Sequence, residues 1–278
     1  MALKASIFYT IIRQEDIRGS RVMIIFKEKA DDIVKASWSV TMKLLHDHLP
    51  AKPIIIKPNI VEPLPPPVTT GVRVIEGIIA ALKDTGMKDI MVAEGSGTGD
   101  TIENFKKLGF HNLGVGLVDL DKEETVTLLT GNYRVWKEIF VPEILLDSFI
   151  ISVPVLKEHS MCGVTISLKN MVGILPAEHY SGYWTYKKSM IHKDNPDGCI
   201  ADIIRAVNPD WAIVDATKGM KDSHISGTPI NPPVNLVYGS ADPLDADIYG
   251  CELLGINWKD IVYLRMIAED QNRGDSSF

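Results

Sequence analysis

The chain has 278 residues, 45% of them hydrophobic and 23% charged, with 29 Lys and Arg against 36 Asp and Glu. This composition is typical of a folded protein and excludes collagen-like, coiled-coil and largely disordered chains. The net charge of -7 argues against a broad nucleic-acid-binding surface, because such surfaces are basic, although a local basic pocket for a small anion is compatible with it.

Strand-like and helix-like segments alternate along the first part of the chain. Apolar strand-like runs and segments with helical apolar spacing follow one another in this order: strand 20–27, helix 30–49, strand 52–57, helix 72–85, strand 88–93 and helix 101–108. Gly86 and Gly109 stand where the second and third helices are expected to end. This β–α order predicts a doubly wound α/β fold, with a mostly parallel sheet and helices on both faces.

The middle of the chain is less regular. Residues 111–147 hold three short strand-like runs and are predicted to form an irregular β-rich insertion. The run 148–155 is the most apolar one and is expected to be a central strand. Residues 176–197 are polar and aromatic without a clear period, which predicts a long loop or a lid.

The last part returns to regular spacing. A helix is expected at 198–207, strands at 211–216 and 234–239, and a final helix from Asp242 to about residue 254. Three aspartates open this helix and could suggest Mg²⁺. Helix-end chemistry explains them better, with Asp242 as N-cap, Pro243 in the first turn, and Asp245 and Asp247 favoured by the helix dipole. We predict a single α/β domain over 1–278, with two lobes as an alternative.

The sequence favours a reducing compartment. No apolar run approaches the roughly 20 residues of a membrane helix, so no membrane partner is expected. Charged residues at 13–16 interrupt the first apolar run, which differs from a secretory leader. The cysteines form no C-x-x-C pair, so neither an iron–sulfur cluster nor a cysteine-type zinc site is expected on this chain. They are Cys162, Cys199 and Cys251. We predict a cytoplasmic protein.

Two junctions between a strand and the next segment carry residues suited to anions, and ligands collect at such junctions in open α/β sheets. Lys57 and Asn59 follow one strand, where an ammonium and an amide can hold an anion or a carbonyl group. The alternative is a solvated lysine before a turn. A second junction is rich in glycine, and its backbone N–H groups can converge on an anion; the alternative is a turn capped by Asp100 or Thr101. Its candidate residues are Glu94, Gly95, Ser96, Gly97 and Thr98.

A third segment carries the most titratable side chains. Lys157 and His159 follow the central apolar strand, and Lys169 and Asn170 come ten residues later. A histidine can transfer a proton near neutral pH, and a desolvated lysine can act as a base or as a covalent anchor. The alternative is a surface loop with solvated lysines. The remaining histidines lack paired spacing on one helix, so no metal site is predicted; among them are His179, His192 and His224.

Five segments in order resemble the domain-of-unknown-function family 362. They read IIIKPNIVEP, IMVAEGSGTGDT, VPVLKEHSMCGVTISLKNMVGIL, AIVDATKGM and VYGSADPLDADIYGCELLG, from about Ile54 to Gly255. Many members carry a ferredoxin-like iron–sulfur module, and the cysteine-rich stretch that such a module needs is missing here. The resemblance therefore implies a stand-alone member, with a separate iron–sulfur protein as one candidate partner.

A remoter resemblance is to lactate racemase. The spacing of His159, Lys169 and Gly173 is similar to the stretch in which that family places a histidine before its cofactor-bearing lysine. The resemblance implies a racemase- or epimerase-type proton transfer, and it raises the option of a covalent nucleotide-type cofactor on Lys169. The glycine pair and the arginine beside that lysine are missing here, which favours a shared fold and pocket over a shared cofactor.

We expect an enzyme that binds a small anionic metabolite or a nucleotide-like cofactor in a cleft lined by Lys and His. Its activity would be that of an isomerase, or it would be associated with an oxidoreductase. His159, Lys169 and Lys157 are the candidate catalytic residues. Lys57, Asn59, the glycine-rich junction from Glu94 to Thr98, and Asn170 are the candidate anion-binding residues. The alternatives are a non-catalytic ligand-binding or electron-transfer partner protein and a subunit of a homo-oligomer.

Overall fold

The computed structural model describes residues 22–129, 133–193 and 195–273. The leader pattern at 13–16 and the start of the strand expected at 20–27 lie outside the described residues. The same holds for residues 130–132 of the predicted insertion and for residue 194 of the predicted lid.

The described chain is built around one large sheet, whose main strands are ordered β1-β12-β10-β7-β2-β3-β4. The strands from β10 to β4 are parallel, whereas β12 runs antiparallel to both β10 and β1. These strands are β1 (Phe26–Lys29), β2 (Ile54–Pro58), β3 (Ile90–Glu94), β4 (Gly116–Asp119), β7 (Phe149–Val153), β10 (Trp211–Lys221) and β12 (Leu236–Ser240). The mixed α/β architecture with a mostly parallel sheet is confirmed.

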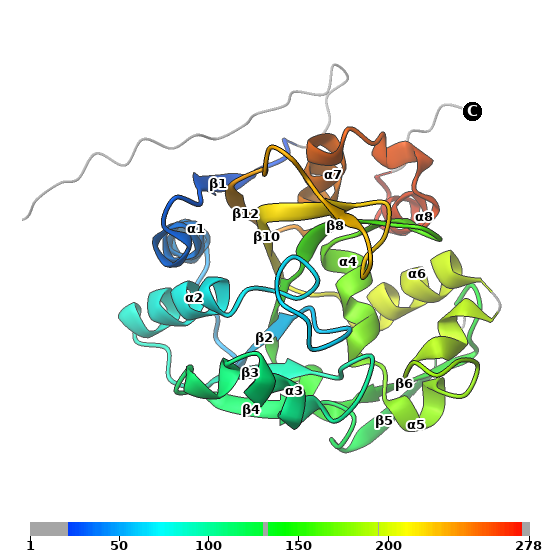
Figure 1. Ribbon diagram of the computed structural model, residues 1–278. Helices are drawn as coiled ribbons and strands as arrows, with labels where there is room; N and C mark the ends of the chain where they lie inside the picture. Colours follow the sequence, from blue (N-terminus) through cyan, green and yellow to red (C-terminus); the bar gives the residue numbers. More distant parts are fainter. Residues whose placement is uncertain (1–21, 130–132, 194, 274–278) are drawn as a thin grey trace, which may run out of the picture.

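Helices cover both faces of this sheet, as Figure 1 shows for α1 and α2 on one side and α4 and α6 on the other. Side chains of β2 alternate between two hydrophobic cores, one on each face of the sheet. Ile54 and Ile56 pack with α1 and α2 in one core, and Ile55 packs with α6, α7 and α8 in the other. The helices are α1 (Ile33–Asp47), α2 (Val72–Asp84), α3 (Thr101–Lys107), α4 (Ser167–Asn170), α5 (Ala177–Tyr180), α6 (Pro196–Ala206), α7 (Pro243–Leu254) and α8 (Val262–Asp270).

Smaller strands extend or flank the sheet. The strand β8 pairs with β10 and β9, and β11 also pairs with β10, while β5 and β6 form a separate antiparallel pair. Their bounds are β5 (Thr125–Leu129), β6 (Glu138–Pro142), β8 (Val155–His159), β9 (Gly163–Thr165) and β11 (Thr228–Pro229). Within the predicted insertion, β4 therefore belongs to the main sheet, and β5 and β6 lie apart from it.

A topological switch point lies between β2 and β7. These strands are neighbours, yet the chain continues from β2 through α2 to β3 on one side, and from β7 through α6 to β10 on the other. Such points in open α/β sheets leave a crevice at the carboxyl ends of the strands. The ends of β2 and β7 therefore mark where a ligand site is expected.

Some local predictions need correction. The single strand expected at 148–155 is two strands: β7 ends at Val153, and the chain resumes after Pro154 as β8, which contains Lys157 and ends at His159. The predicted loop at 176–197 contains the short helix α5 and a 3-10 turn, Ser189–His192. The four-residue helix α4 and the helix α8 have no counterpart among the expected elements.

The helices of the described residues are too short or too polar to cross a membrane.

Candidate functional site

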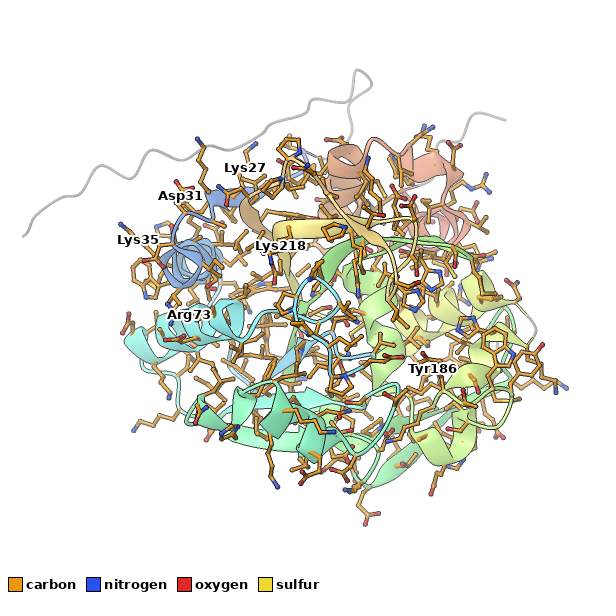
Figure 2. The ribbon with its side chains drawn as sticks, viewed as in Figure 1. Lys27, Asp31, Lys35, Arg73, Tyr186 and Lys218 are labelled. Carbon is orange, nitrogen blue, oxygen red and sulfur yellow. The ribbon has the colours of Figure 1, made fainter. Side chains whose placement is uncertain are left out.

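A cavity of about 310 Å³ lies at the carboxyl ends of β2, β3 and β8. Its size is near the lower end of the roughly 300–1,000 Å³ of small-molecule sites. One wall comes from the segment between α5 and α6, which includes Tyr186, labelled in Figure 2. The polar side chains that line it are Lys57, Asn59, Glu94, His159, Ser160, Thr165, Lys169, Asn170, Tyr186, Lys187, Lys188, Ser189, His192 and His224.

The first group of charges is a buried ion pair between Lys57 and Glu94. The Lys57 Nζ atom lies 2.9 Å from each carboxylate oxygen, and both side chains are almost fully buried. Burial lowers the pKa of Lys57 and raises the pKa of Glu94, and the attraction between the two charges opposes both changes. Glu94 also accepts the amide hydrogens of Ile60 and Gly95. The carboxylate is thereby fixed at the end of β3.

A second ion pair stands beside the first. Asp121 accepts hydrogen bonds from Lys188 at 2.8 Å and from Lys187 at 3.0 Å. Lys188 is buried and has a φ of 61°, a left-handed conformation that costs a non-glycine residue about 1–2 kcal/mol. Its placement therefore depends on the surrounding contacts. Two ammonium groups share one carboxylate here, so one positive charge remains uncompensated at this end of the cavity.

Three histidines and Lys169 form the histidine–lysine cluster of the cavity: His159, His192, His224 and Lys169. The rings of His159 and His224 are stacked, with centroids 4.2 Å apart. Burial first, and then the charge of Lys169, lowers the pKa of His192 to about 4, that of His224 to about 3 and that of His159 further still. All three imidazoles are therefore neutral at neutral pH, and Lys169 is the neighbour they share.

Each of these rings has a buried nitrogen without a hydrogen-bond partner among the described residues. The orphan atoms are Nε2 of His159 and Nδ1 of both His192 and His224. A buried polar atom left unpaired costs free energy, so such atoms point to a ligand or to ordered water. In the described chain, no group of three His, Cys, Asp or Glu side chains is arranged to hold a metal ion.

Hydrogen bonds determine which nitrogen of His159 carries the proton. Its Nδ1 accepts the amide hydrogens of Met161 at 3.1 Å and Cys162 at 3.2 Å. A nitrogen that accepts cannot also donate, so the neutral ring carries its hydrogen on Nε2. The orphan Nε2 of His159 is therefore a buried hydrogen-bond donor on a residue that lines the cavity.

Lys169 differs from the other buried lysines. It is 8% exposed and lines the cavity, yet its Nζ makes no hydrogen bond or ion pair with any described residue. Burial lowers its pKa, while the more distant Cys162 and Asp197 act in the opposite direction. A buried amine with a lowered pKa is available as a base or as a nucleophile.

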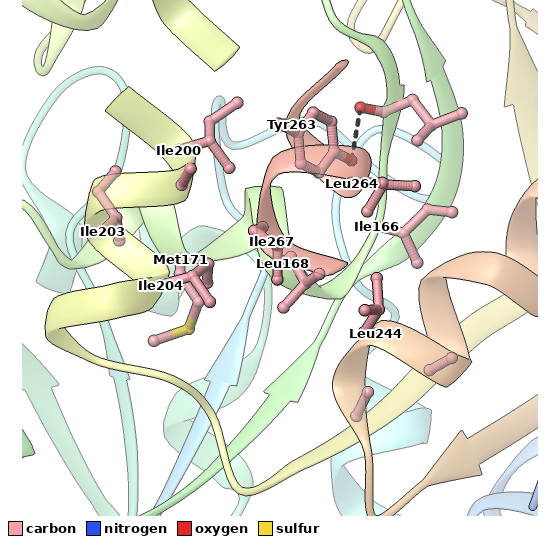
Figure 3. Packing of buried hydrophobic residues seen from close by; sticks show 14 of the residues in the cluster. Ile166, Leu168, Met171, Ile200, Ile203, Ile204, Leu244, Tyr263, Leu264 and Ile267 are labelled. Atoms are coloured by element: carbon pink, nitrogen blue, oxygen red, sulfur yellow. Dashed lines mark hydrogen bonds between the residues drawn. The ribbon is translucent and has the colours of Figure 1, made fainter. Parts of the chain in front are cut away.

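The short helix α4 positions Lys169. Asp247 of α7 accepts the amide hydrogens of Ser167 at 2.8 Å and Leu168 at 3.1 Å, so it caps α4 from another helix. Leu168 and Met171 pack among residues of α6 and α8, as Figure 3 shows, and the Tyr263 hydroxyl donates to the Val164 carbonyl at 3.3 Å. Asp247 thus acts on α4, whereas its position in the sequence indicated only the dipole of its own helix.

Two asparagines join the strands at the switch point. Asn170 donates through Nδ2 to the Lys57 carbonyl and to the Ser152 hydroxyl, both at 3.1 Å. The Asn59 Oδ1 accepts from Lys157 at 2.6 Å, and the Asn59 Nδ2 donates to Asn170 at 3.3 Å. Lys157 also donates to the carbonyls of residues 68 and 224, so its three hydrogens are used, and burial lowers its pKa to about 7. Lys157 holds Asn59 and does not line the cavity.

The structure brings most of the predicted site residues to one place. Lys57, Asn59, Glu94, Gly95, Gly97, His159, Lys169 and Asn170 all line the cavity, whereas Ser96, Thr98 and Lys157 do not. The amides of the glycine-rich junction have partners within the protein: Gly95 donates to Glu94 and to the carbonyl of residue 173, Ser96 to Thr101, and Gly97 to the carbonyl of residue 60. An anion is therefore better served by the lysine side chains.

Sequence reasoning missed the second ion pair and two walls of the cavity. His192 and His224 were considered only as metal ligands, and Lys188 and Asp121 lie 67 residues apart without a local signal that links them. Met161 and Trp184, which are 51% and 49% exposed, also line the cavity and mark its mouth. The aromatic residues at 183–186 were the one usable signal in the sequence.

The fold and the site define an α/β protein with a small-molecule cavity at the switch point of its sheet. The family model for the domain of unknown function 362 (DUF362) matches residues 54–252, and the chain belongs to this family. This stretch contains all of the residues that line the cavity. Neither the curated proteins nor the solved structures give a match. The resemblance to lactate racemase stays an expectation.

Proposed function

We propose that this chain is an enzyme that binds a small anionic metabolite in the cavity and transfers a proton on it, in the manner of a racemase or epimerase. The observation that carries the proposal is the state of Lys169. Its amine is buried in the cavity, has no partner among the described residues, and lies within electrostatic reach of three neutral histidines. Perturbed titratable groups that converge in a pocket are typical of catalytic sites.

The charges around the cavity support an anionic ligand. Lys57 and Glu94 compensate each other, whereas Lys187 and Lys188 share Asp121 and therefore leave one positive charge over. We assign the anionic group of the ligand to this second pair. Lys57 keeps the carboxylate of Glu94 in place, and Asn59 and Asn170 orient the ligand beside it.

The roles within the histidine–lysine cluster follow from the hydrogen bonds. Because the hydrogen of His159 is on Nε2, His159 donates to an oxygen of the ligand and polarises it. Lys169 takes the proton from the adjacent carbon, and His192 or His224, through the orphan Nδ1, delivers or removes a proton on the other side. Lys157 is a positioning residue that acts through Asn59.

We also propose a cytoplasmic location. The three cysteines are free and buried, which suits a reducing compartment.

Proton exchange with solvent tests the proposal. The protein is incubated in D₂O with L-lactate, L-malate or pyruvate, and proton NMR follows the loss of signal at the carbon beside the carboxylate or carbonyl group. We expect exchange with at least one probe, its loss in Lys169→Met and its retention in Lys106→Met, a matched change on the exposed face of α3. Equal exchange by the two variants, or none by the unmodified chain, would overturn the proposal.

A further inference from the structure

We infer that Lys169 captures the carbonyl carbon of a small 2-oxo acid as an imine, which makes 2-oxo acids the substrate class of the cavity. This inference rests on the proposed function and deepens it, because an imine acidifies the neighbouring C–H bond that the proposed reaction must break. With its nitrogen bound to the substrate, Lys169 is no longer the base, and the C–H proton passes to His192 or His224. It starts from a comparison among the buried lysines of the described chain.

Four lysines of the described chain are buried, and three have clear structural partners. Lys57 is paired with Glu94, Lys188 is paired with Asp121, and Lys157 donates to three oxygen acceptors. Lys169 has no such partner among the described residues, although α4 and Asp247 hold its backbone rigidly. A lone ammonium in this position would be costly to bury, whereas a neutral amine is not. The arrangement therefore favours a nucleophile over a structural cation.

The neighbours of Lys169 provide what a carbonyl group needs. The Nε2 hydrogen of His159 can bond to the carbonyl oxygen and draw electrons from its carbon. His224 stacks on His159, and its orphan Nδ1 lies in the same buried cluster. A neutral imidazole can take up the proton that the amine loses and return it to the leaving hydroxyl group.

The bonds balance without any oxidant or reductant. The Nζ lone pair attacks the carbonyl carbon, the C=O π electrons move to oxygen, and a proton passes from nitrogen to that oxygen, which gives a carbinolamine. The hydroxyl group then leaves as water after it receives a second proton from a neighbouring histidine, the nitrogen lone pair forms the C=N bond, and that histidine regains a proton from the remaining hydrogen on the nitrogen. One N–C bond forms, one C–O bond breaks, and one water is released.

The carboxylate of a 2-oxo acid matches the remaining charge of the cavity. Lys187 and Lys188 together carry one positive charge more than Asp121 balances, and both line the cavity with Lys169. A neutral ketone or aldehyde would leave that charge without a counter-ion. A carbonyl compound that also carries a carboxylate, such as a 2-oxo acid, therefore supplies an electrophile for Lys169 and a counter-ion for this pair.

Reductive trapping tests the inference. The full chain is mixed with pyruvate and sodium borohydride, which reduces an imine to a stable secondary amine, and intact mass and peptide mapping locate the adduct. We expect one reduced pyruvate adduct per chain, on the peptide that contains Lys169. Lys169→Arg, which has a long basic side chain but no amine to form the imine, should lose the adduct, and Lys106→Arg should keep it. Circular dichroism verifies that both variants are folded.

The outcomes separate this inference from the proposed function. No adduct, or an adduct on Lys57, Lys187, Lys188 or surface lysines in place of Lys169, overturns the imine. Deuterium exchange without an adduct overturns the imine and leaves the proposed proton transfer standing. An adduct on Lys169 without proton exchange on any of the three probes supports the imine and overturns the proton transfer.

Discussion

The ammonium group of Lys57 lies 2.9 Å from both carboxylate oxygens of Glu94, inside the protein and at the edge of the cavity. Removal of one partner leaves a buried charge, and such changes cost about 3–5 kcal/mol. We expect Lys57→Met to lower the free energy of unfolding by about this amount in urea titrations, against less than about 1 kcal/mol for Lys106→Met in the exposed pair with Glu103.

A double-mutant cycle sharpens this test. Glu94→Gln removes the charge that Lys57→Met leaves behind, so the double variant should lose less stability than the two single variants together. Strictly additive losses would show that the two side chains act independently.

Gly173 is required by the same ion pair. A Cβ atom at this position would overlap Oε1 of Glu94 and lie 2.6 Å from Nζ of Lys57. We expect Gly173→Ala to destabilise the protein by roughly 1–3 kcal/mol and to weaken ligand binding. Gly116→Ala is the matched control, because its Cβ would meet only the Met91 side chain at 3.5 Å. Thermal denaturation that gives equal losses for both variants would refute the role of Gly173.

The cap that Asp247 provides for α4 predicts a pH dependence of stability. Burial raises the pKa of Asp247 to about 8 from an ordinary 3.8, although its two amide hydrogen bonds oppose the change. Between these values the folded chain holds a proton that the unfolded chain releases, so this contribution to the free energy of unfolding falls as pH rises.

Comparison with Asp247→Asn isolates the contribution of Asp247 to the pH dependence of stability. The stability difference is the free energy of unfolding of the unmodified chain minus that of the variant. We expect this difference to fall by about 1–4 kcal/mol from pH 5 to pH 8. Urea titrations at the two pH values measure it. A difference that stays constant, or rises with pH, would contradict the buried state of Asp247.

Trp184 at the mouth of the cavity predicts a preference for ligands with an apolar end. It is half exposed and stacks on His192, with ring centroids 4.9 Å apart. We expect Trp184→Ala to weaken the binding of phenylpyruvate several-fold and that of pyruvate hardly at all, because only the former reaches the mouth. Tyr183→Ala is the control, since Tyr183 is 44% exposed and does not line the cavity. Calorimetric titrations that show equal losses for both ligands would contradict this assignment.

Local signals predicted those parts of the fold whose physics is local. Three consecutive isoleucines at 54–56 suit a strand buried on both faces, and Asp242 with Pro243 starts α7 as expected. Pro154 lies inside the strand expected at 148–155, and in the structure it separates β7 from β8. The brief α4 has four residues, and its stability comes from Asp247, which lies 80 residues from Ser167.

The candidate site was predicted only in part, because some of its contacts follow from local sequence signals and others do not. Lys57 and His159 lie at or near the ends of apolar strands, and Lys169 lies in a recognisable motif. The topology of the sheet therefore predicts that these residues lie close together. The partners that decide their chemistry could not be predicted, because the contacts of Glu94 with Lys57 and of Asp121 with Lys188 are long-range in sequence. The Nδ1 contacts of His159, which make the ring a donor, depend on how the chain turns after β8.

Chemical rescue of Lys169→Ala tests the central claim most directly. The rate of deuterium exchange is measured by NMR with the best of the three probes, for the unmodified chain and for the variant with increasing ethylamine. We predict that the variant loses exchange by roughly 100-fold or more and that ethylamine restores part of it in proportion to its concentration. A variant that exchanges at the original rate without ethylamine would show that the Lys169 amine moves no proton.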